Sequence, residues 1–284
     1  MIRLCAFADE AAESVTGQIA ALKRNGIGLI ELRGLDGVNI SEITEEKARE
    51  YAALFEKEGI KVWSIGSPLG KVDIKGDFDE YVALVHHVCR LANIFGTKRV
   101  RIFSFYGAYD DEAEVVRRLN IMVLIAETYG VMLCHENEKL IFGDTPERCL
   151  ALLDAVKGLR AIYDPANYVE VGADAIDAKL ALYEKIDYYH IKDVIAATGE
   201  LVPAGLGDCN IRNLVTDLGN DEDKVFTIEP HLRVFSGYSS IDPTEMKNKY
   251  SFDTGDEAFD AACNALKVIL NDCGYTEYDG EYKK

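Results

Sequence analysis

The chain has 284 residues, 48% of them hydrophobic, and its 49 acidic residues outnumber 31 basic ones to give a net charge of −18. A field of that sign repels phosphate groups, which excludes nucleic acid and anionic membrane surfaces as expected partners. The length is close to the roughly 250 residues of a single barrel of alternating strands and helices. We therefore expect one domain over residues 1–284.

The cysteine pattern and the absence of long apolar runs indicate a location. The seven cysteines are scattered, and none forms a CxxC pair. An odd number of cysteines without a signal-peptide pattern is typical of a reducing compartment. No stretch of about 18 apolar residues occurs. We expect a cytoplasmic protein with no membrane span.

In the first half of the chain, short apolar or β-branched runs alternate with longer segments of helical periodicity. The runs predict strands at residues 2–8, 29–34, 61–67 and 99–105. The periodic segments predict helices at residues 14–26, 45–59, 79–96 and 112–130. The first helix ends on Asn25-Gly26, a residue pair that is typical of a helix C-terminus.

The alternation continues through the second half. Strands are expected at residues 131–136, 161–165, 188–193 and 225–230, and helices at 146–158 and 256–274. Thr145-Pro146 is a typical helix start, with a capping threonine and a proline at the first helical position. Eight strands in alternation with helices predict an α/β protein with a closed (β/α)8 TIM barrel. A doubly wound open sheet is the alternative, but the phosphate-binding motif GxGxxG is absent after the first strand.

Four side chains that can bind a divalent metal stand at the ends of the last four predicted strands. They are Glu136, Asp164, His190 and Glu229. A parallel barrel brings the C-terminal ends of its strands together, so these groups should converge. Three carboxylates and one imidazole suit Mn, Mg, Co or Zn. His135 and Glu138 are rival candidates for the ligand on the fifth strand.

Alternation along the strands predicts which side chains point into the barrel. On each of three predicted strands, one set of alternating residues is expected to point inward. These sets are Met132, Cys134 and Glu136; Tyr188, His190 and Lys192; and Val225, Thr227 and Glu229. A buried lysine is costly without a partner, so Lys192 is expected to contact a substrate oxygen or phosphate.

Other polar residues near strand ends are candidates for substrate binding. Glu31 either recognises a hydroxyl group or forms an ion pair with Arg33 on the same face of the second strand. Ser67 and Lys71 follow the third strand, and His231 follows Glu229. His231 could contact substrate, support a metal ligand, or be an ordinary loop histidine.

At these residues the chain resembles the sugar phosphate isomerase/epimerase superfamily, the xylose isomerase-like barrels. The motifs that carry the resemblance are Glu136-Asn137-Glu138, Gly143-Asp144-Thr145, Asp164-Pro165-Ala166-Asn167, His190-Ile191-Lys192-Asp193, Pro203-Ala204-Gly205 and Glu229-Pro230-His231. The resemblance covers essentially the whole chain. It implies one divalent metal held by Glu136, Asp164, His190 and Glu229, with Glu136 and Glu229 also transferring protons.

Two positions depart from the pattern. Ketose 3-epimerases of this superfamily place a histidine shortly after the metal-binding aspartate, where this chain has Asn167. The loop after the seventh strand often carries Glu or Arg between its glycines, where this chain has Leu206. Both differences leave the substrate and the presence of catalysis open.

Three functions remain. The first is a metal-dependent isomerase or epimerase of a small sugar, sugar phosphate or sugar derivative, with proton transfer through an enediolate. The second is an endonuclease IV-like metal-dependent hydrolase, which the five histidines and the negative net charge argue against. The third is a non-catalytic sugar-binding barrel. A homo-oligomer is compatible with each of them.

Overall fold

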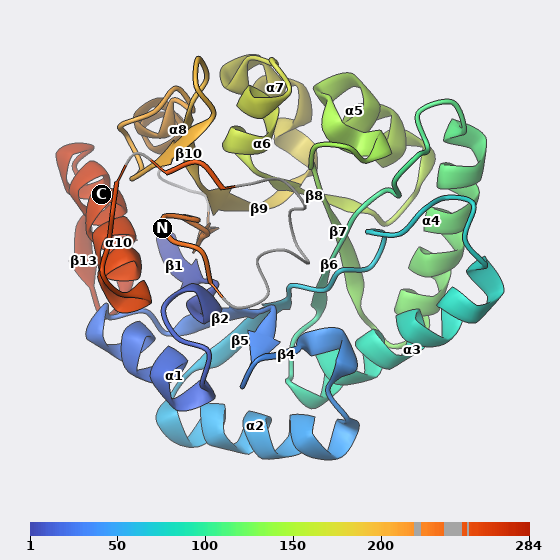
Figure 1. The fold of residues 1–284 in the computed structure, drawn as a ribbon, viewed down its shortest axis with the longest axis horizontal. Coiled ribbons are helices and arrows are strands. Elements are labelled where there is room, and N and C mark those ends of the chain that lie inside the picture. The colour runs from blue at the N-terminus through green and yellow to red at the C-terminus, as the bar shows by residue number, and fades with distance from the viewer. Residues whose placement is uncertain (219–222, 236–245, 249) are drawn as a thin grey trace.

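In the computed structural model, which describes residues 1–218, 223–235, 246–248 and 250–284, eight parallel strands close into a barrel (Figure 1). The strands are β1 (Ile2–Ala6), β2 (Leu29–Leu32), β5 (Lys61–Ile65), β6 (Arg99–Ile102), β7 (Met132–Glu136), β8 (Arg160–Tyr163), β9 (Ile186–Ile191) and β12 (Lys224–Ile228). Each pairs in parallel with the next, and β12 pairs with β1 to close the ring. The predicted (β/α)8 barrel is confirmed.

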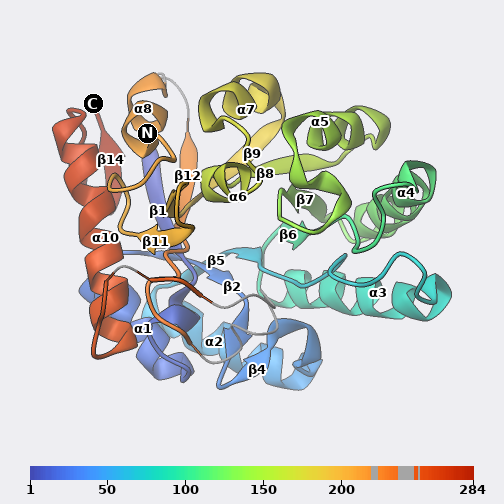
Figure 2. The same ribbon diagram turned by 45° about the horizontal axis from the view of Figure 1, so that its top comes forward.

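Helices surround the barrel (Figure 1). They are α1 (Val15–Arg24), α2 (Glu45–Glu58), α3 (Phe78–Ile94), α4 (Glu112–Thr128), α5 (Pro146–Ala155), α6 (Pro165–Glu170), α7 (Ala175–Leu182), α8 (Ile211–Asp217) and α10 (Gly255–Asp272). Figure 2 shows α5, α6 and α7 on one side of the strands and α1, α2 and α3 on the other. The Thr145 side chain accepts a hydrogen bond from Arg148 N at the start of α5, as the sequence predicted. Within the described parts of the chain, no helix is long and apolar enough to cross a membrane.

The first four strands end earlier than the predicted ranges, and after β6 the cause is that the next residues bond to the loop after β5 instead of to a neighbouring strand. Phe103 N donates to Leu69 O at 2.7 Å, and Phe105 N donates to Gly70 O at 2.9 Å. Gly70 has φ of +90°, and a Cβ atom there would lie 2.1 Å from Phe103 O. Only glycine allows this close approach.

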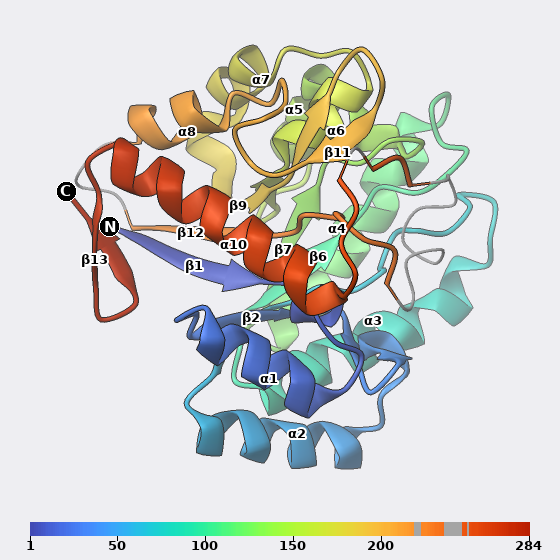
Figure 3. The ribbon, with the colours of Figure 1, turned by 60° about the vertical axis from the view of Figure 1, so that its left-hand side comes forward.

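Three antiparallel hairpins were not predicted from the sequence. They are β3–β4 (Gly34–Leu35 and Val38–Asn39), β10–β11 (Asp193–Ile195 and Glu200–Val202) and β13–β14 (Thr276–Tyr278 and Glu281–Lys283). The last hairpin joins the barrel, because β14 pairs with the start of β1. Figure 3 shows both termini and β13 together at one end of the barrel, beside α10.

The barrel interior is filled by a small cluster of buried residues, Cys5, Cys134, Ile162, Tyr188 and Val225. A much larger cluster lies between the strands and the helices. Four of the five interior residues, Cys134, Ile162, Tyr188 and Val225, stand two or four positions before a predicted metal ligand. The alternation inferred from the sequence is therefore confirmed for β7, β9 and β12.

Candidate metal centre

Four predicted ligands converge at the C-terminal end of the barrel. Glu136 ends β7, Asp164 follows β8, His190 lies in β9 and Glu229 follows β12. Each offers one ligand atom, and these atoms all lie within 4.8 Å of one another. All four residues are at most 2% exposed. The ends of parallel barrel strands meet at this face, so residues far apart in the chain form one cluster.

Local hydrogen bonds fix the orientation of Asp164. Its Oδ1 caps α6 by accepting from Ala166 N at 2.8 Å and Asn167 N at 3.1 Å. Asn137 holds the backbone beside it, donating from Nδ2 to Asp164 O at 2.9 Å and accepting from Asp164 N at 3.0 Å. Asp164 Oδ2 remains directed into the cluster.

The His190 ring has one nitrogen on each side of the site. Nδ1 lies 2.9 Å from Glu136 Oε1 and 3.0 Å from Glu229 Oε2. Nε2 lies 3.1 Å from Glu31 Oε2, on the side away from the cluster. A carboxylate on the outer nitrogen of a metal-binding histidine fixes its tautomer and ring orientation. The geometry therefore makes Nδ1 the candidate ligand atom.

Glu31 is held by protein donors. Tyr188 OH donates to its Oε1 at 2.7 Å, and Thr227 Oγ1 donates to its Oε2 at 2.9 Å. With His190 these are three partners for a side chain that is 1% exposed. A substrate contact by Glu31 stays a prediction, and the observed bonds fit a residue that positions His190.

Three buried carboxylate oxygens in the cluster have no hydrogen-bond partner in the described part of the chain. They are Glu136 Oε2, Asp164 Oδ2 and Glu229 Oε2. Each has an ion-pair contact at 3.0–3.1 Å, with Arg101, Lys192 and His190 respectively, but none accepts a well-directed hydrogen bond from a described residue. Buried oxygens of this kind are costly unless a ligand or ion satisfies them. Oxygen donors with one imidazole fit a hard or borderline divalent cation, so the residues present suit a metal.

The electrostatics of the cluster follow from burial and from close opposite charges. Burial raises the pKa of Asp164 to about 7, although Lys192 beside it acts in the opposite direction. For His190, burial would lower the pKa, but Glu136, Glu31 and Glu229 raise it well above its ordinary value. Burial would raise the pKa of Glu229, but His190 outweighs it and holds that pKa well below its ordinary value.

Two arginines lie in the site, and one of them, Arg101, was not assigned a role from the sequence. Arg101 Nη1 lies 3.1 Å from Glu136 Oε2 and 3.7 Å from Glu229 Oε1. Arg33 Nη1 lies 2.9 Å from Glu229 Oε1. Each is 3% exposed. A charged side chain at an inward position of a buried strand requires a partner, and this was the available signal for Arg101.

Arg33 also lies among a second set of possible metal ligands beside the four-residue cluster. Glu10, Glu229 and His231 have candidate ligand atoms close enough for another metal. Arg33 already stands among them, 3.2 Å from Glu10 Oε1 and 3.5 Å from His231 Nε2, and it also pairs with Asp9. The sequence predicted an ion pair of Arg33 with Glu31 as one alternative. The ion pairs that Arg33 forms are instead with Asp9, Glu10 and Glu229. The guanidinium group supplies the positive charge that a second metal would bring.

Lys192 reaches the edge of the cluster, as its predicted inward direction requires. Its Nζ lies 3.1 Å from Asp164 Oδ2 and donates to Asn167 Oδ1 at 2.7 Å. Asn167 in turn donates to Asn137 O at 2.8 Å. The residue that departs from the ketose 3-epimerase pattern therefore holds Lys192.

The remaining substrate-binding candidates differ in their surroundings. His231 lies beside the cluster, with Nε2 3.6 Å from Glu229 Oε1. Lys71 pairs with Glu138 at 3.0 Å and is 4% exposed. Ser67 Oγ donates to the backbone carbonyl of Arg101, so it supports the loop after β5. Substrate contacts by all three remain predictions.

The rival ligands His135 and Glu138 do not join the four-residue cluster. His135 faces the outside of the barrel, where its Nε2 lies 3.0 Å from Ser104 Oγ. Burial lowers its pKa to about 4. Glu138 lies beyond β7 and pairs with Lys71.

The loop after β9 is organised by Asp193. Its carboxylate accepts from Gly205 N at 2.7 Å, Gly207 N at 3.0 Å and Cys209 N at 3.1 Å. Leu206 between the glycines is 57% exposed. Positions 236–245 and 249, between β12 and α10, lie outside the described residues.

Comparison with known proteins agrees with this architecture. Residues 19–250 match the family model described as xylose isomerase-like TIM barrel. A 3-dehydroshikimate dehydratase from Bacillus anthracis is 26% identical over 192 residues, which are 65% of this chain and 68% of the relative.

Solved structures share the fold at low sequence identity. The probable 3-DHS dehydratase AsbF from Bacillus anthracis has a TM-score of 0.71 and 19% identity, covering 94% of this chain and 99% of that one. The IOLI protein with a bound zinc atom has a TM-score of 0.73 and 17% identity, covering 95% and 98%. An L-ribulose 3-epimerase has a TM-score of 0.73 and 18% identity, covering 96% of both chains. At these identities the structures establish the fold alone.

Proposed function

The chain belongs to the xylose isomerase-like TIM barrel family, and from that premise we propose that it is a metal-dependent isomerase or epimerase of a small sugar or sugar derivative. The observation that carries the proposal is the convergence of Glu136, Asp164, His190 and Glu229, with three buried carboxylate oxygens that have ion-pair contacts but accept no hydrogen bond among the described residues. Such a site suits Mn, Mg, Co or Zn. The zinc in the similar IOLI structure supports a divalent metal, and its identity here is open.

A metal held by these four residues would act as a Lewis acid that polarises the carbonyl group of an open-chain sugar. The chain itself supplies the groups that move protons. Glu136 and Glu229 approach His190 from two different strands. Burial would raise the pKa of both carboxylates, but the charge on His190 lowers it, with Arg101 adding to the effect on Glu136. One glutamate removes the proton from the carbon beside the carbonyl, and the other returns a proton. Return to the opposite face gives epimerisation, and return to the adjacent carbon gives isomerisation.

Lys192 is the group best placed to stabilise negative charge on the substrate. Its ammonium lies beside Asp164 Oδ2 and is fixed by Asn167. A preorganised cation in a dry site stabilises charge that develops during the reaction far more than it would in water. We expect it to contact an oxygen atom of the intermediate or a phosphate group of the substrate.

A dehydratase is the second candidate, and the similarity to the Bacillus anthracis 3-dehydroshikimate dehydratase favours it. Both reactions begin with loss of the proton next to a carbonyl group. In a dehydratase the electron pair then expels a neighbouring hydroxyl group, which leaves with a proton as water. No oxidant or reductant is required. The same glutamates would serve both reactions, and the product would distinguish them.

The site gives less support to a multinuclear hydrolase. Arg33 lies where the second acidic group could hold another cation. The net charge of −18 would also repel the phosphate backbone of a nucleic acid substrate. A barrel that only binds sugar would keep the same residues but would not exchange substrate protons. Nucleic acid and membrane are not proposed as partners, and a homo-oligomer is compatible with the proposal.

Solvent exchange tests the proposal directly. The protein is loaded in turn with Mn, Co and Zn and incubated in heavy water with ketoses, ketose phosphates and 3-dehydroshikimate. Deuterium in recovered substrate or in an epimeric product, followed by NMR, supports proton transfer. Loss of water from 3-dehydroshikimate would favour the dehydratase. Absence of exchange into every compound, with metal bound, would favour a binding protein.

Matched variants identify the groups responsible. Glu229→Gln keeps the volume and an oxygen donor but removes the charge that accepts a proton. We expect exchange to fall by about 10²–10⁴-fold. His87→Gln is the control, because His87 lies on α3 and bonds to Ile43 O. Exchange at equal rates in wild type and Glu229→Gln would show that Glu229 is a ligand only.

A further inference from the structure

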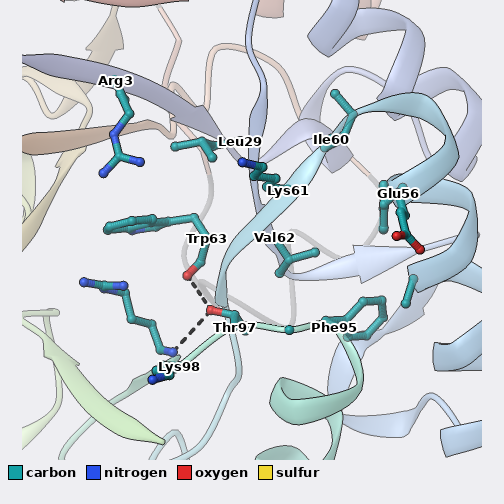
Figure 4. A pocket seen from close by; sticks show the side chains of 14 residues that line it. Arg3, Leu29, Glu56, Ile60, Lys61, Val62, Trp63, Phe95, Thr97 and Lys98 are labelled. Atoms are coloured by element: carbon teal, nitrogen blue, oxygen red, sulfur yellow. Dashed lines mark hydrogen bonds between the residues drawn. The ribbon is translucent and has the colours of Figure 1, made fainter.

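The end of the barrel opposite the metal centre contains a cavity of about 480 Å³ (Figure 4). Its residues come from the starts of β1, β2, β5 and β6, from the C-terminal half of α2 and from the loops that precede β5 and β6. None of them belongs to the site described above. Ligand pockets typically enclose about 300–1,000 Å³. We propose that this cavity binds a small organic anion that carries a carboxylate or phosphate group on an apolar body.

The charge of the lining is opposite to that of the whole chain. Arg3, Lys61, Lys98 and Arg99 line the cavity, against one acidic lining residue, Glu56. The chain has a net charge of −18. A concave surface with this local charge attracts anions even in an acidic protein, because the walls focus the field.

One aromatic ring organises the basic groups. The guanidinium carbon of Arg99 lies 3.8 Å from the centre of the Trp63 ring, and that of Arg3 lies 5.3 Å from it. Figure 4 shows the Arg3 side chain directed toward this ring. Arg99 is also paired with Asp187. Stacking on Trp63 holds the Arg3 guanidinium in place, which reduces the entropy lost when it binds a ligand.

Two donors at the cavity lack acceptors. Trp63 Nε1 and Arg3 Nε are buried atoms with no hydrogen-bond partner within the described residues. A buried N–H group without an acceptor destabilises the folded protein. A bound carboxylate or phosphate oxygen would satisfy such donors with charge-assisted hydrogen bonds.

The rest of the lining is apolar and defines the body of the ligand. Leu29, Phe55, Ile60, Val62 and Phe95 form this part of the wall. A flat or branched hydrocarbon can pack here while its anionic group faces the arginines. An inorganic ion alone would leave these side chains uncovered.

The cavity also adjoins Tyr188, which is hydrogen-bonded to the residue that positions His190. Trp63 packs edge-on against Tyr188, with ring centres 6.0 Å apart. Tyr188 in turn donates to Glu31, which contacts His190. The proposal does not depend on catalysis, and its test measures binding alone.

Trp63 is the only tryptophan of the chain, so its fluorescence reports directly on this cavity. The metal-loaded protein is titrated with benzoate and phenyl phosphate, and with benzamide as a neutral molecule of similar shape. We expect saturable changes with the two anions, and the tighter one identifies the preferred charged group. Benzamide should bind at least about tenfold more weakly, because it lacks the charge. Equal affinity for benzamide and both anions would refute an anion site.

Variants separate this cavity from any other binding place. Arg3→Gln should weaken anion binding about tenfold. Arg49→Gln removes the same charge from α2 outside the cavity and should change the affinity less than twofold, because Arg49 is exposed and paired with Glu45. Lys98→Gln, at an exposed side chain, replaces Arg3→Gln if that variant does not fold. Trp63→Phe, measured by calorimetry, should also bind more weakly because it lacks the indole N–H. Unchanged affinity in folded Arg3→Gln or Lys98→Gln would overturn the proposal.

Discussion

Replacing Glu31 should weaken metal binding even though Glu31 is not one of the four candidate ligands. Its carboxylate accepts a hydrogen bond from His190 Nε2 at 3.1 Å, so Nε2 keeps its proton, and Nδ1, directed at Glu136 and Glu229, is the nitrogen that gives up its proton when a metal binds. A histidine must be unprotonated at the nitrogen that binds metal. Glu31 should therefore determine the metal affinity through the ring of His190.

The size of the effect follows from the hydrogen bonds of each replacement. In Glu31→Gln the amide oxygen can still face His190, and the amide NH₂ can donate to Tyr188 OH, which then donates to Ser64 Oγ, 3.1 Å away. Only the negative charge is lost, and we expect about tenfold weaker metal binding. In Glu31→Met no acceptor remains for His190, and we expect metal binding to be about 100-fold weaker than in the wild type. These values span the usual range for a residue that supports a metal ligand, about 1.4–2.7 kcal/mol.

The assay is a competition between protein and a chromophoric chelator for Zn²⁺ and Co²⁺ at pH 7.5, after metal has been removed. Circular dichroism and thermal unfolding of the metal-free variants confirm that each is folded. Ser64→Ala is the matched control, because it removes a partner of Tyr188 without touching His190. The control should change the affinity less than twofold.

A folded Glu31→Met variant with the metal affinity of the wild type would refute the argument, because His190 would then be oriented without its carboxylate partner. A wild type that binds neither metal would instead refute the assignment of the site itself. The two failures are distinguishable, since only the second concerns the wild-type protein.

Three further predictions concern charge, pH and packing. Lys192→Met should retain metal but lower turnover of the accepted substrate by about 100-fold, because it removes the ammonium beside Asp164; unchanged turnover with metal content verified would contradict this role. Burial lowers the pKa of His135 from 6.5 to about 4, so its contribution to stability is complete above pH 6.5 and is lost as the pH falls, by about 2 kcal/mol at pH 5. Urea unfolding of His135→Gln should therefore depend less on pH between 7.5 and 5 than that of the wild type, and equal dependence would exclude this contribution. Gly70→Ala should lower the free energy of unfolding by more than about 2 kcal/mol, because its Cβ would lie 2.1 Å from Phe103 O at a φ of +90°; a smaller loss in urea unfolding would mean that the loop can move.

The barrel and the four-residue cluster could be predicted from the sequence because both depend on local patterns. Apolar runs and helical periodicity are read within windows of about ten residues. Once a parallel barrel is inferred, a residue at the C-terminal end of each strand is placed at the same face. Alternation then determined the inward direction of Glu136, His190 and Glu229, which the structure reproduces.

The sequence did not predict where the strands stop or where the hairpins form. The residues after β6 have the composition of a strand, yet Phe103 and Phe105 bond to the loop at Leu69 and Gly70. Whether such a residue continues a sheet depends on which backbone lies beside it. That neighbour comes from a distant part of the chain.

The partners within the site were decided only by the tertiary structure. Arg33 meets Glu229 across 196 positions of the chain, and Glu31 meets His190 across 159. No spacing rule connects such pairs, because closure of the barrel sets their distance. The same holds for the basic cavity at the opposite end, where Arg3 reaches Trp63 only because β1 and β5 start at the same end of the barrel. The sequence by itself determined which side chains could bind a metal, and folding decided which charges surround them.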